Sequence, residues 1–102
     1  MENFYKKIYN CVKLIPFGRV ATYGEIARAC GNEKASRVVG FALLKNSDQD
    51  SIPGYRVVNK DGSLSKRFAY GGISAQKYML MKEGISVKNN KVDLKRYGFY
   101  FW

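Results

Sequence analysis

The side chains best suited to binding chemistry lie at residues 52–58, Ile-Pro-Gly-Tyr-Arg-Val-Val. A rigid Pro53 followed by Gly54 lets the backbone approach a partner closely. Tyr55 then offers a ring for stacking, and Arg56 offers a planar fork that fits a phosphate or a base edge. With Asn46 before it, the stretch reads either as the wall of a pocket or as a structural turn, and its spacing fits both.

A second pair is Tyr23 and Arg37, which we place at the starts of two successive helices of a helix-turn-helix. In that motif the two side chains can converge on the face that meets DNA. A tyrosine ring there can press on a backbone phosphate, and an arginine can enter the base stack where a nucleotide has been extruded. An ordinary phosphate contact or a solvated side chain is the alternative for Arg37.

The third candidate is the loop at residues 69–72, Ala-Tyr-Gly-Gly. It reads as a segment that closes a pocket, with Tyr70 as a stacking or hydrogen-bonding group. The alternative is a plain connection into the next helix.

No set of catalytic residues is present, because the chain contains no histidine. This excludes the Ser-His-Asp and Cys-His arrangements and removes the commonest zinc ligand. Gly71-Gly72 lacks the spacing and the lysine of a phosphate-binding loop, and the acidic residues are scattered. We therefore predict no catalytic residue, no metal and no cofactor. Cys11 and Cys30 lie in apolar helical patterns and are predicted to be buried thiols, with a disulfide as the alternative.

The formal net charge is +10, of which +3 falls in residues 1–50 and +7 in residues 51–102. A small domain this basic should attract a polyanion, with nucleic acid ahead of a membrane surface. No apolar run approaches the roughly 20 residues of a membrane span, and the start of the chain lacks a signal-peptide pattern. We expect a monomeric single domain over residues 1–102, located in the cytoplasm with the nucleoid, or in the nucleus of a eukaryote.

The elements expected to position these residues are four helices and two short hairpins. The predicted helices cover about 4–14, 22–30, 34–45 and 74–84, and the predicted hairpins join 55–58 to 63–65 and 85–88 to 92–94. The first hairpin follows the helix-turn-helix and reads as its wing, with cations from Lys60, Lys66 and Arg67. The predicted fold is mainly α with a small β wing, a winged helix-turn-helix.

Several local signals support these boundaries. Thr22 and Glu25 form the pattern of a capping box, and Ile73 with Tyr78 has the spacing of a hydrophobic staple. Gly40 lowers the stability of its helix, which makes sense if another backbone approaches there. The aromatic tail at residues 97–102 is predicted to pack on the core.

Residues 15–27, Ile-Pro-Phe-Gly-Arg-Val-Ala-Thr-Tyr-Gly-Glu-Ile-Ala, resemble the C-terminal DNA-binding domain of O6-alkylguanine-DNA alkyltransferases. So do residues 36–40, Asn46 followed by 52–58, and the pairs Asp61-Gly62, Gly71-Gly72 and Glu83-Gly84. Those enzymes carry Pro-Cys-His-Arg at residues 53–56, where the cysteine accepts the alkyl group and the histidine activates it through a water. With Gly54 and Tyr55 in their place, the chain is similar to the alkyltransferase-like proteins, many of which carry tryptophan at this glycine.

The resemblance implies roles for individual residues. Tyr23 would rotate the phosphate that drives the base out, Arg37 would fill the gap, and Asn46 would hold the hinge of the pocket. The other implied pocket residues are Pro53, Gly54, Tyr55, Val57 and Tyr70, and the glycine would make room for bulkier adducts. The other implied DNA contacts are Ala35, Ser36, Gly40, Lys45 and Arg56, with the small residues letting the helix approach the minor groove.

The resulting prediction is a non-enzymatic sensor of O6-alkylguanine in double-stranded DNA. It would flip the lesion base, bend the duplex and flag the site for nucleotide excision repair proteins. A general winged-helix DNA-binding or regulatory protein without lesion specificity is the first alternative. Residual alkyl transfer through Cys30 or another thiol is the second, and RNA binding fits the charge equally well.

Overall fold

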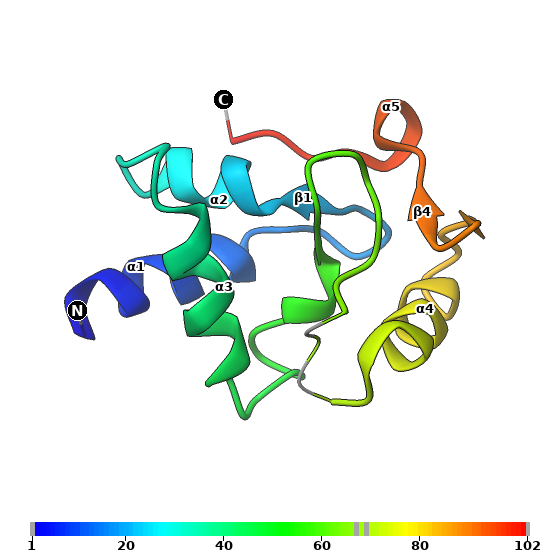
Figure 1. Ribbon diagram of the computed structural model, residues 1–102, viewed down its shortest axis with the longest axis horizontal. Coiled ribbons are helices and arrows are strands. Elements are labelled where there is room, and N and C mark those ends of the chain that lie inside the picture. Colours follow the sequence, from blue (N-terminus) through cyan, green and yellow to red (C-terminus); the bar gives the residue numbers. More distant parts are fainter. Residues whose placement is uncertain (1, 67, 69, 102) are drawn as a thin grey trace.

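The computed structural model describes residues 2–66, 68 and 70–101. In chain order the elements are α1 (Glu2–Lys13), β1 (Ala21–Thr22), α2 (Tyr23–Ala29), α3 (Ser36–Leu44), the 3-10 turn η1 (Gly54–Arg56), β2 (Val57–Val58), α4 (Gly72–Met81), β3 (Val87–Lys88), β4 (Lys91–Val92) and α5 (Leu94–Tyr97). Figure 1 shows α1, α2 and α3 grouped at one end of the molecule, with α4, α5 and the β4 hairpin at the other. The predicted fold class, mainly helical with a small β wing, is confirmed.

The core consists of two apolar clusters that meet at the short ladder of β1 and β2. Ala21 and Val57 belong to the cluster under α1, α2 and α3, whereas Val58 belongs to the cluster under α4 and α5. The two strands are parallel and pair Ala21 with Val57. Because side chains alternate across a strand, the two residues of β2 face different clusters.

The pairing of β2 differs from the expected hairpin. Val57 and Val58 were predicted to pair with residues 63–65, but they pair with β1 instead. The chain does turn back after β2, where the Asn59 amide donates to the Ser63 carbonyl at 2.9 Å. The central position between two clusters buries both valines fully, which an exposed wing strand could not do. The second hairpin, β3 with β4, forms as predicted over Asn89 and Asn90.

The helix boundaries agree with the prediction within a few residues, but two local signals differ. The Thr22 hydroxyl accepts the Glu25 amide at 3.1 Å, while the Glu25 carboxylate lies 3.8 Å from Arg28, so only half of the capping box forms. The predicted staple of Ile73 and Tyr78 is wrong, because α4 begins at Gly72 and Tyr78 is 65% exposed.

The aromatic tail packs as expected where it is described. Phe99 and Phe101 pack against the first cluster with their rings 5.0 Å apart, so the chain end returns to the α2 side of the molecule (Figure 1). Trp102, like Arg67 and Ala69 of the predicted wing and loop, lies outside the described residues. No helix among the described residues is long and apolar enough to cross a membrane.

Candidate functional site

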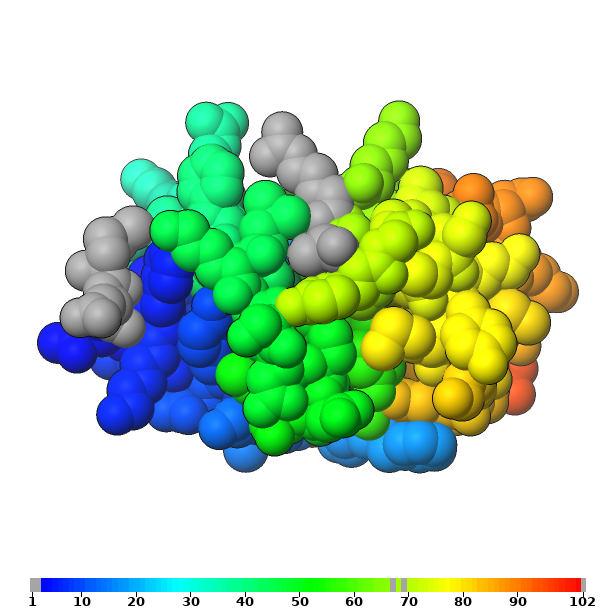
Figure 2. Space-filling view, turned by 90° about the horizontal axis from the view of Figure 1, so that it is seen from below, coloured from blue at the N-terminus to red at the C-terminus, as the bar shows by residue number. Residues whose placement is uncertain are grey.

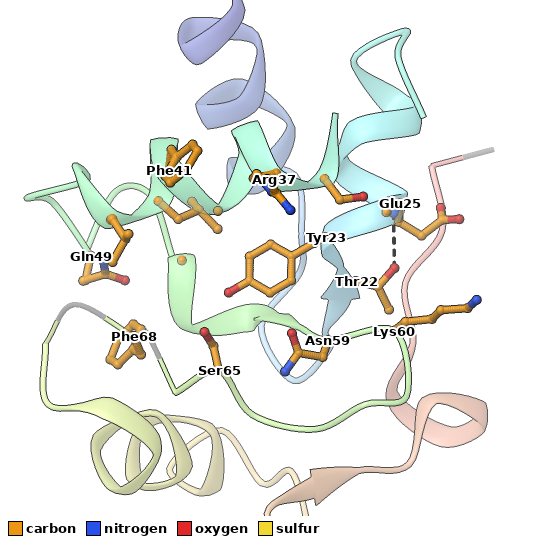
Figure 3. A pocket seen from close by; sticks show the side chains of 16 residues that line it. Thr22, Tyr23, Glu25, Arg37, Phe41, Gln49, Asn59, Lys60, Ser65 and Phe68 are labelled. Carbon is orange, nitrogen blue, oxygen red and sulfur yellow. Dashed lines mark hydrogen bonds between the residues drawn. The ribbon is translucent and has the colours of Figure 1, made fainter. Parts of the chain in front are cut away.

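A cavity of about 580 Å³ opens between α3 and the segment that runs from η1 toward α4. Figure 3 shows the ring of Tyr23 in its centre, with Arg37 and Phe41 on α3 along one side. Asn59 and Ser65 lie on the facing side, beyond β2. This volume is in the range of small-molecule and cofactor sites.

Tyr23 is placed by the N-terminus of α2, which Thr22 caps. Burial raises the pKa of its phenol above the ordinary value, and a hydrogen bond with Ser65 acts in the opposite direction. The hydroxyl is therefore neutral at physiological pH and able both to donate and to accept a hydrogen bond. Tyr23 lies in the cavity, where the sequence placed it.

The face of α3 that borders the cavity is open. Arg37 is exposed and has no hydrogen bond or ion pair with any described residue. Gly40 also lines the cavity, and a methyl group added to it would meet no atom within 4 Å. The approaching backbone that we expected at Gly40 is therefore absent from the described part of this chain, which leaves room for an external partner. Ser36 lines the same face, and Ala35 is buried at the N-cap of α3.

Of the seven predicted pocket residues, Tyr23 and Gly54 line the cavity and the other five do not. Val57 is fully buried in the core. Asn46 is 3% exposed, and its side-chain amide is hydrogen-bonded within the chain. It donates to the Ile52 carbonyl at 2.9 Å and accepts from the Asp48 amide at 3.0 Å. The Tyr70 hydroxyl donates to the Asn46 carbonyl at 2.7 Å. The remaining two are Pro53 and Tyr55.

Arg56 does not line the cavity, and its role as a DNA contact stays a prediction. Its guanidinium donates to both carboxylate oxygens of Glu83, at 2.7–3.0 Å, and to the Ile15 carbonyl at 2.9 Å. The two side chains are 14% and 4% exposed. All three nitrogens are therefore used inside the chain, and Arg56 holds η1 to the end of α4.

Tyr55 joins the same network and also points away from the cavity. Its hydroxyl donates to Glu83 Oε2 at 2.7 Å. Burial, followed by this bond to a carboxylate, raises the pKa of Tyr55 to about 12. Glu83 also accepts the Gly18 amide at 2.8 Å. Although burial alone would raise the pKa of Glu83, its hydrogen bonds from Arg56, Gly18 and Tyr55 hold that pKa below the ordinary value.

Sequence reasoning missed several residues that border or support the cavity, among them Gln49, Gln76 and Phe68. Gln49 lines it from the loop before η1, and nothing in that polar loop singled it out. Gln76 is fully buried on α4 and accepts the Ser65 amide at 2.8 Å while donating to the carbonyls of Tyr55 and Val57. An amide at a core position of a helix was the available signal. Phe68 also lines the cavity, opposite α3 (Figure 3).

The outlying candidates lie away from the cavity. Lys45 caps α3 and places its ammonium 5.7 Å from the ring of Tyr5. Cys11 and Cys30 are free, half-buried thiols with sulfurs 3.6 Å apart, rather than fully buried ones. Burial raises the pKa of Cys30 to about 12, so its thiol is unreactive at neutral pH.

Among the described residues no group of histidine, cysteine or carboxylate side chains is arranged to hold a metal.

Basic side chains gather around the cavity and not within it. Lys60 stands at one end of the opening, and Arg37 at its side (Figure 3). Figure 2 shows side chains from the green α3 region and from the yellow-green segment before α4 rising from the same edge of the molecule. A strongly anionic partner that lies across this edge would meet cations on both sides of the cavity.

Comparison with known proteins places these features in context. Residues 3–85 match the model of the 6-O-methylguanine DNA methyltransferase DNA-binding domain. Alkyltransferase-like protein 1 of Schizosaccharomyces pombe is 41% identical over 87 residues, covering 85% of this chain and 81% of that protein. A bifunctional methyltransferase/endonuclease of Picrophilus torridus is 41% identical over 98 residues, covering 95% of this chain, which spans only 32% of that protein.

The fold also matches a solved structure over its full length. The crystal structure of S. pombe Atl1 in complex with damaged DNA containing O6-carboxymethylguanine superposes with a TM-score of 0.90 at 37% identity. The match covers 99% of this chain and 98% of that one. The relatives thus include both an alkyltransferase-like protein and methyltransferases.

Proposed function

This chain belongs to the family of the 6-O-methylguanine DNA methyltransferase DNA-binding domain, and from that premise we propose that it recognises O6-alkylguanine in duplex DNA without transferring the alkyl group. The lesion base enters the cavity beside Tyr23 and Gly54. Arg37, exposed and unpaired among the described residues, takes the place that the base leaves in the stack. The bound complex then marks the site for nucleotide excision repair proteins.

The observation that carries the proposal is the pair Gly54 and Tyr55. Gly54 presents no nucleophile at the cavity, and the Tyr55 hydroxyl is already donated to Glu83. A phenol with a pKa of about 12 cannot accept a proton at neutral pH. The cavity therefore has the shape to receive a base and lacks the groups that would react with it.

This arrangement favours recognition of DNA by its damage and its deformability. Gly40 and Ser36 are small residues on the face of α3 that borders the cavity, and they suit close approach to a minor groove. Extruding a base costs less where its pairing is already weakened, so a lesion lowers the cost of entry.

A binding titration tests the proposal. Fluorescence anisotropy with duplexes that differ only in one base, O6-methylguanine or guanine, is expected to give tighter binding to the damaged duplex. Intact-protein mass measured after incubation is expected to show no added methyl group. Equal affinity for the two duplexes would instead indicate a general winged-helix DNA-binding protein, and a mass gain of one methylene group would indicate a transferase.

A further inference from the structure

Gln49 places its side-chain amide directly over Gly54. A methyl group added at Gly54 would lie 3.3 Å from Gln49 Oε1 and 3.5 Å from Gln49 Nε2. The amide therefore occupies the space into which any larger side chain at position 54 would project. The floor of the cavity, which glycine leaves bare, is covered by a polar group from a different segment.

The carbonyl of this amide has an unmet hydrogen bond. Gln49 Oε1 is buried and has no hydrogen-bond partner among the described residues. A buried carbonyl without a donor is unfavourable, and such groups are rare enough in folded proteins to require an explanation. Turning the amide toward the cavity would let a ligand that supplies a donor remove the penalty.

The loop that carries Gln49 is firmly held. The Ile52 amide donates to the Asp48 carbonyl at 2.9 Å, and the Ser51 amide donates to the Asp48 carboxylate at 3.1 Å. Asn46 ties the two ends of the loop together by accepting from Asp48 and donating to Ile52. Figure 3 shows Gln49 and Phe68 on the same side of the cavity. The backbone that carries Gln49 is thus held beside the cavity.

We propose that the Gln49 amide is the part of the cavity that selects among adducts, favouring O6 substituents that end in a hydrogen-bonding group over apolar substituents of equal size. This inference rests on the proposed function, because it assumes that the O6 substituent reaches the Gln49 amide that covers Gly54. A primary amide both donates and accepts, so it can meet a terminal hydroxyl or, with its nitrogen turned inward, a carboxylate. An apolar tip would leave the amide buried without a partner.

The test uses a matched pair of adducts. O6-(2-hydroxyethyl)guanine and O6-propylguanine have the same number of heavy atoms and differ only in a terminal hydroxyl or methyl group. The wild-type protein is expected to bind the hydroxyethyl duplex about five- to tenfold more tightly. Gln49→Met keeps the length of the side chain without the amide, and it is expected to abolish that preference.

Two further variants sharpen the result. Gln49→Glu keeps the shape and is expected to lower affinity for O6-carboxymethylguanine at least tenfold, through repulsion of like charges, relative to its affinity for the hydroxyethyl adduct. Asp50→Asn, an exposed change in the same loop, is expected to alter neither preference. Wild-type protein that binds both adducts equally, yet more tightly than guanine, would overturn the role of Gln49 and leave the proposed function standing. Equal binding to adducts and guanine would overturn both.

Discussion

Tyr55 decides at the level of one side chain what chemistry this site supports. Its hydroxyl is a hydrogen-bond donor to Glu83, so the group that stands beside the cavity floor holds its proton and faces away. With a tyrosine and not a base at residue 55, the cavity floor has no need of a reactive group. Gly54, with the Gln49 amide above it, then provides a surface for recognition.

Restoring a thiol at the floor is therefore expected to be insufficient for alkyl transfer. Gly54→Cys with Gln49→Ala supplies a nucleophile and clears the space that the amide occupies, but Tyr55 cannot remove the proton of the thiol. Adding Tyr55→His to this variant is expected to raise the rate of methyl transfer by about 10²–10⁴-fold, the usual contribution of a positioned base. The mass of the protein after incubation with O6-methylguanine DNA measures transfer, and equal rates with and without Tyr55→His would contradict this role for Tyr55.

Arg37→Ala is expected to weaken binding to the O6-methylguanine duplex by about 1–3 kcal/mol. The loss should be larger for damaged than for undamaged DNA, because the side chain acts where a base has left the stack. Lys88→Ala removes the same charge from the hairpin at the other end of the molecule (Figure 1) and serves as the control. An equal loss in both variants, measured by titration, would reduce Arg37 to an ordinary phosphate contact.

At the scale of elements, the Arg56–Glu83 pair connects three segments that are distant in sequence. Glu83 accepts from Gly18 and Tyr55 as well as from Arg56, so the end of α4 is joined to η1 and to the turn after α1. Gln76 adds a second tie from α4 to the backbone on both sides of η1 and to Ser65. The cavity floor is held from behind by buried polar contacts.

Glu83→Gln is expected to destabilise the protein by about 2–4 kcal/mol near pH 7, because it leaves Arg56 buried without its counter-charge. The pKa of Glu83 is below its ordinary value of 4.5 in the folded protein. Its stabilising effect is thus complete above that value and is lost as the pH falls through the lower folded pKa. Urea denaturation at about pH 7 and pH 3 should show that the difference in free energy of unfolding between wild type and variant is smaller in acid. An equal difference at both pH values would contradict the stabilising role of the ionised Glu83 carboxylate.

Local sequence signals predicted the elements whose causes are local. The capping threonine, the glycine after α2 and the helical periodicity placed α1, α2 and α3, and the Asn89-Asn90 turn placed the last hairpin. The pairing of β2 with β1 joins residues 36 apart, and nothing in two valines indicates which distant strand they meet. The position of Gln49 depends on the path of a loop, and no local signal indicates that Arg56 pairs with a residue 27 positions away.

At the scale of the whole molecule, charge and shape act together. The net charge of +10 is spread over the surface, but Arg37 and Lys60 border the cavity itself. An anionic duplex would be drawn to the protein from a distance and then oriented by the few cations at the opening.

Binding to DNA is therefore expected to depend steeply on salt. For about five phosphate contacts, affinity should fall roughly 10²–10³-fold between about 50 and 200 mM monovalent salt. Lys60→Ala should reduce the slope of log affinity against log salt by about one, for damaged and undamaged duplexes alike. A slope unchanged by this substitution would remove Lys60 from the interface.

The two-residue ladder of β1 and β2 has a mechanical consequence. Tyr23 follows β1 directly and Gly54 to Arg56 precede β2 directly, so one rigid crossbar carries both the central ring and the floor of the cavity. The distance between Tyr23 and Gly54 would then limit how far an extruded base can enter the cavity. If the proposed function holds and this spacing is kept on binding, the opening of the duplex would set the rate of recognition.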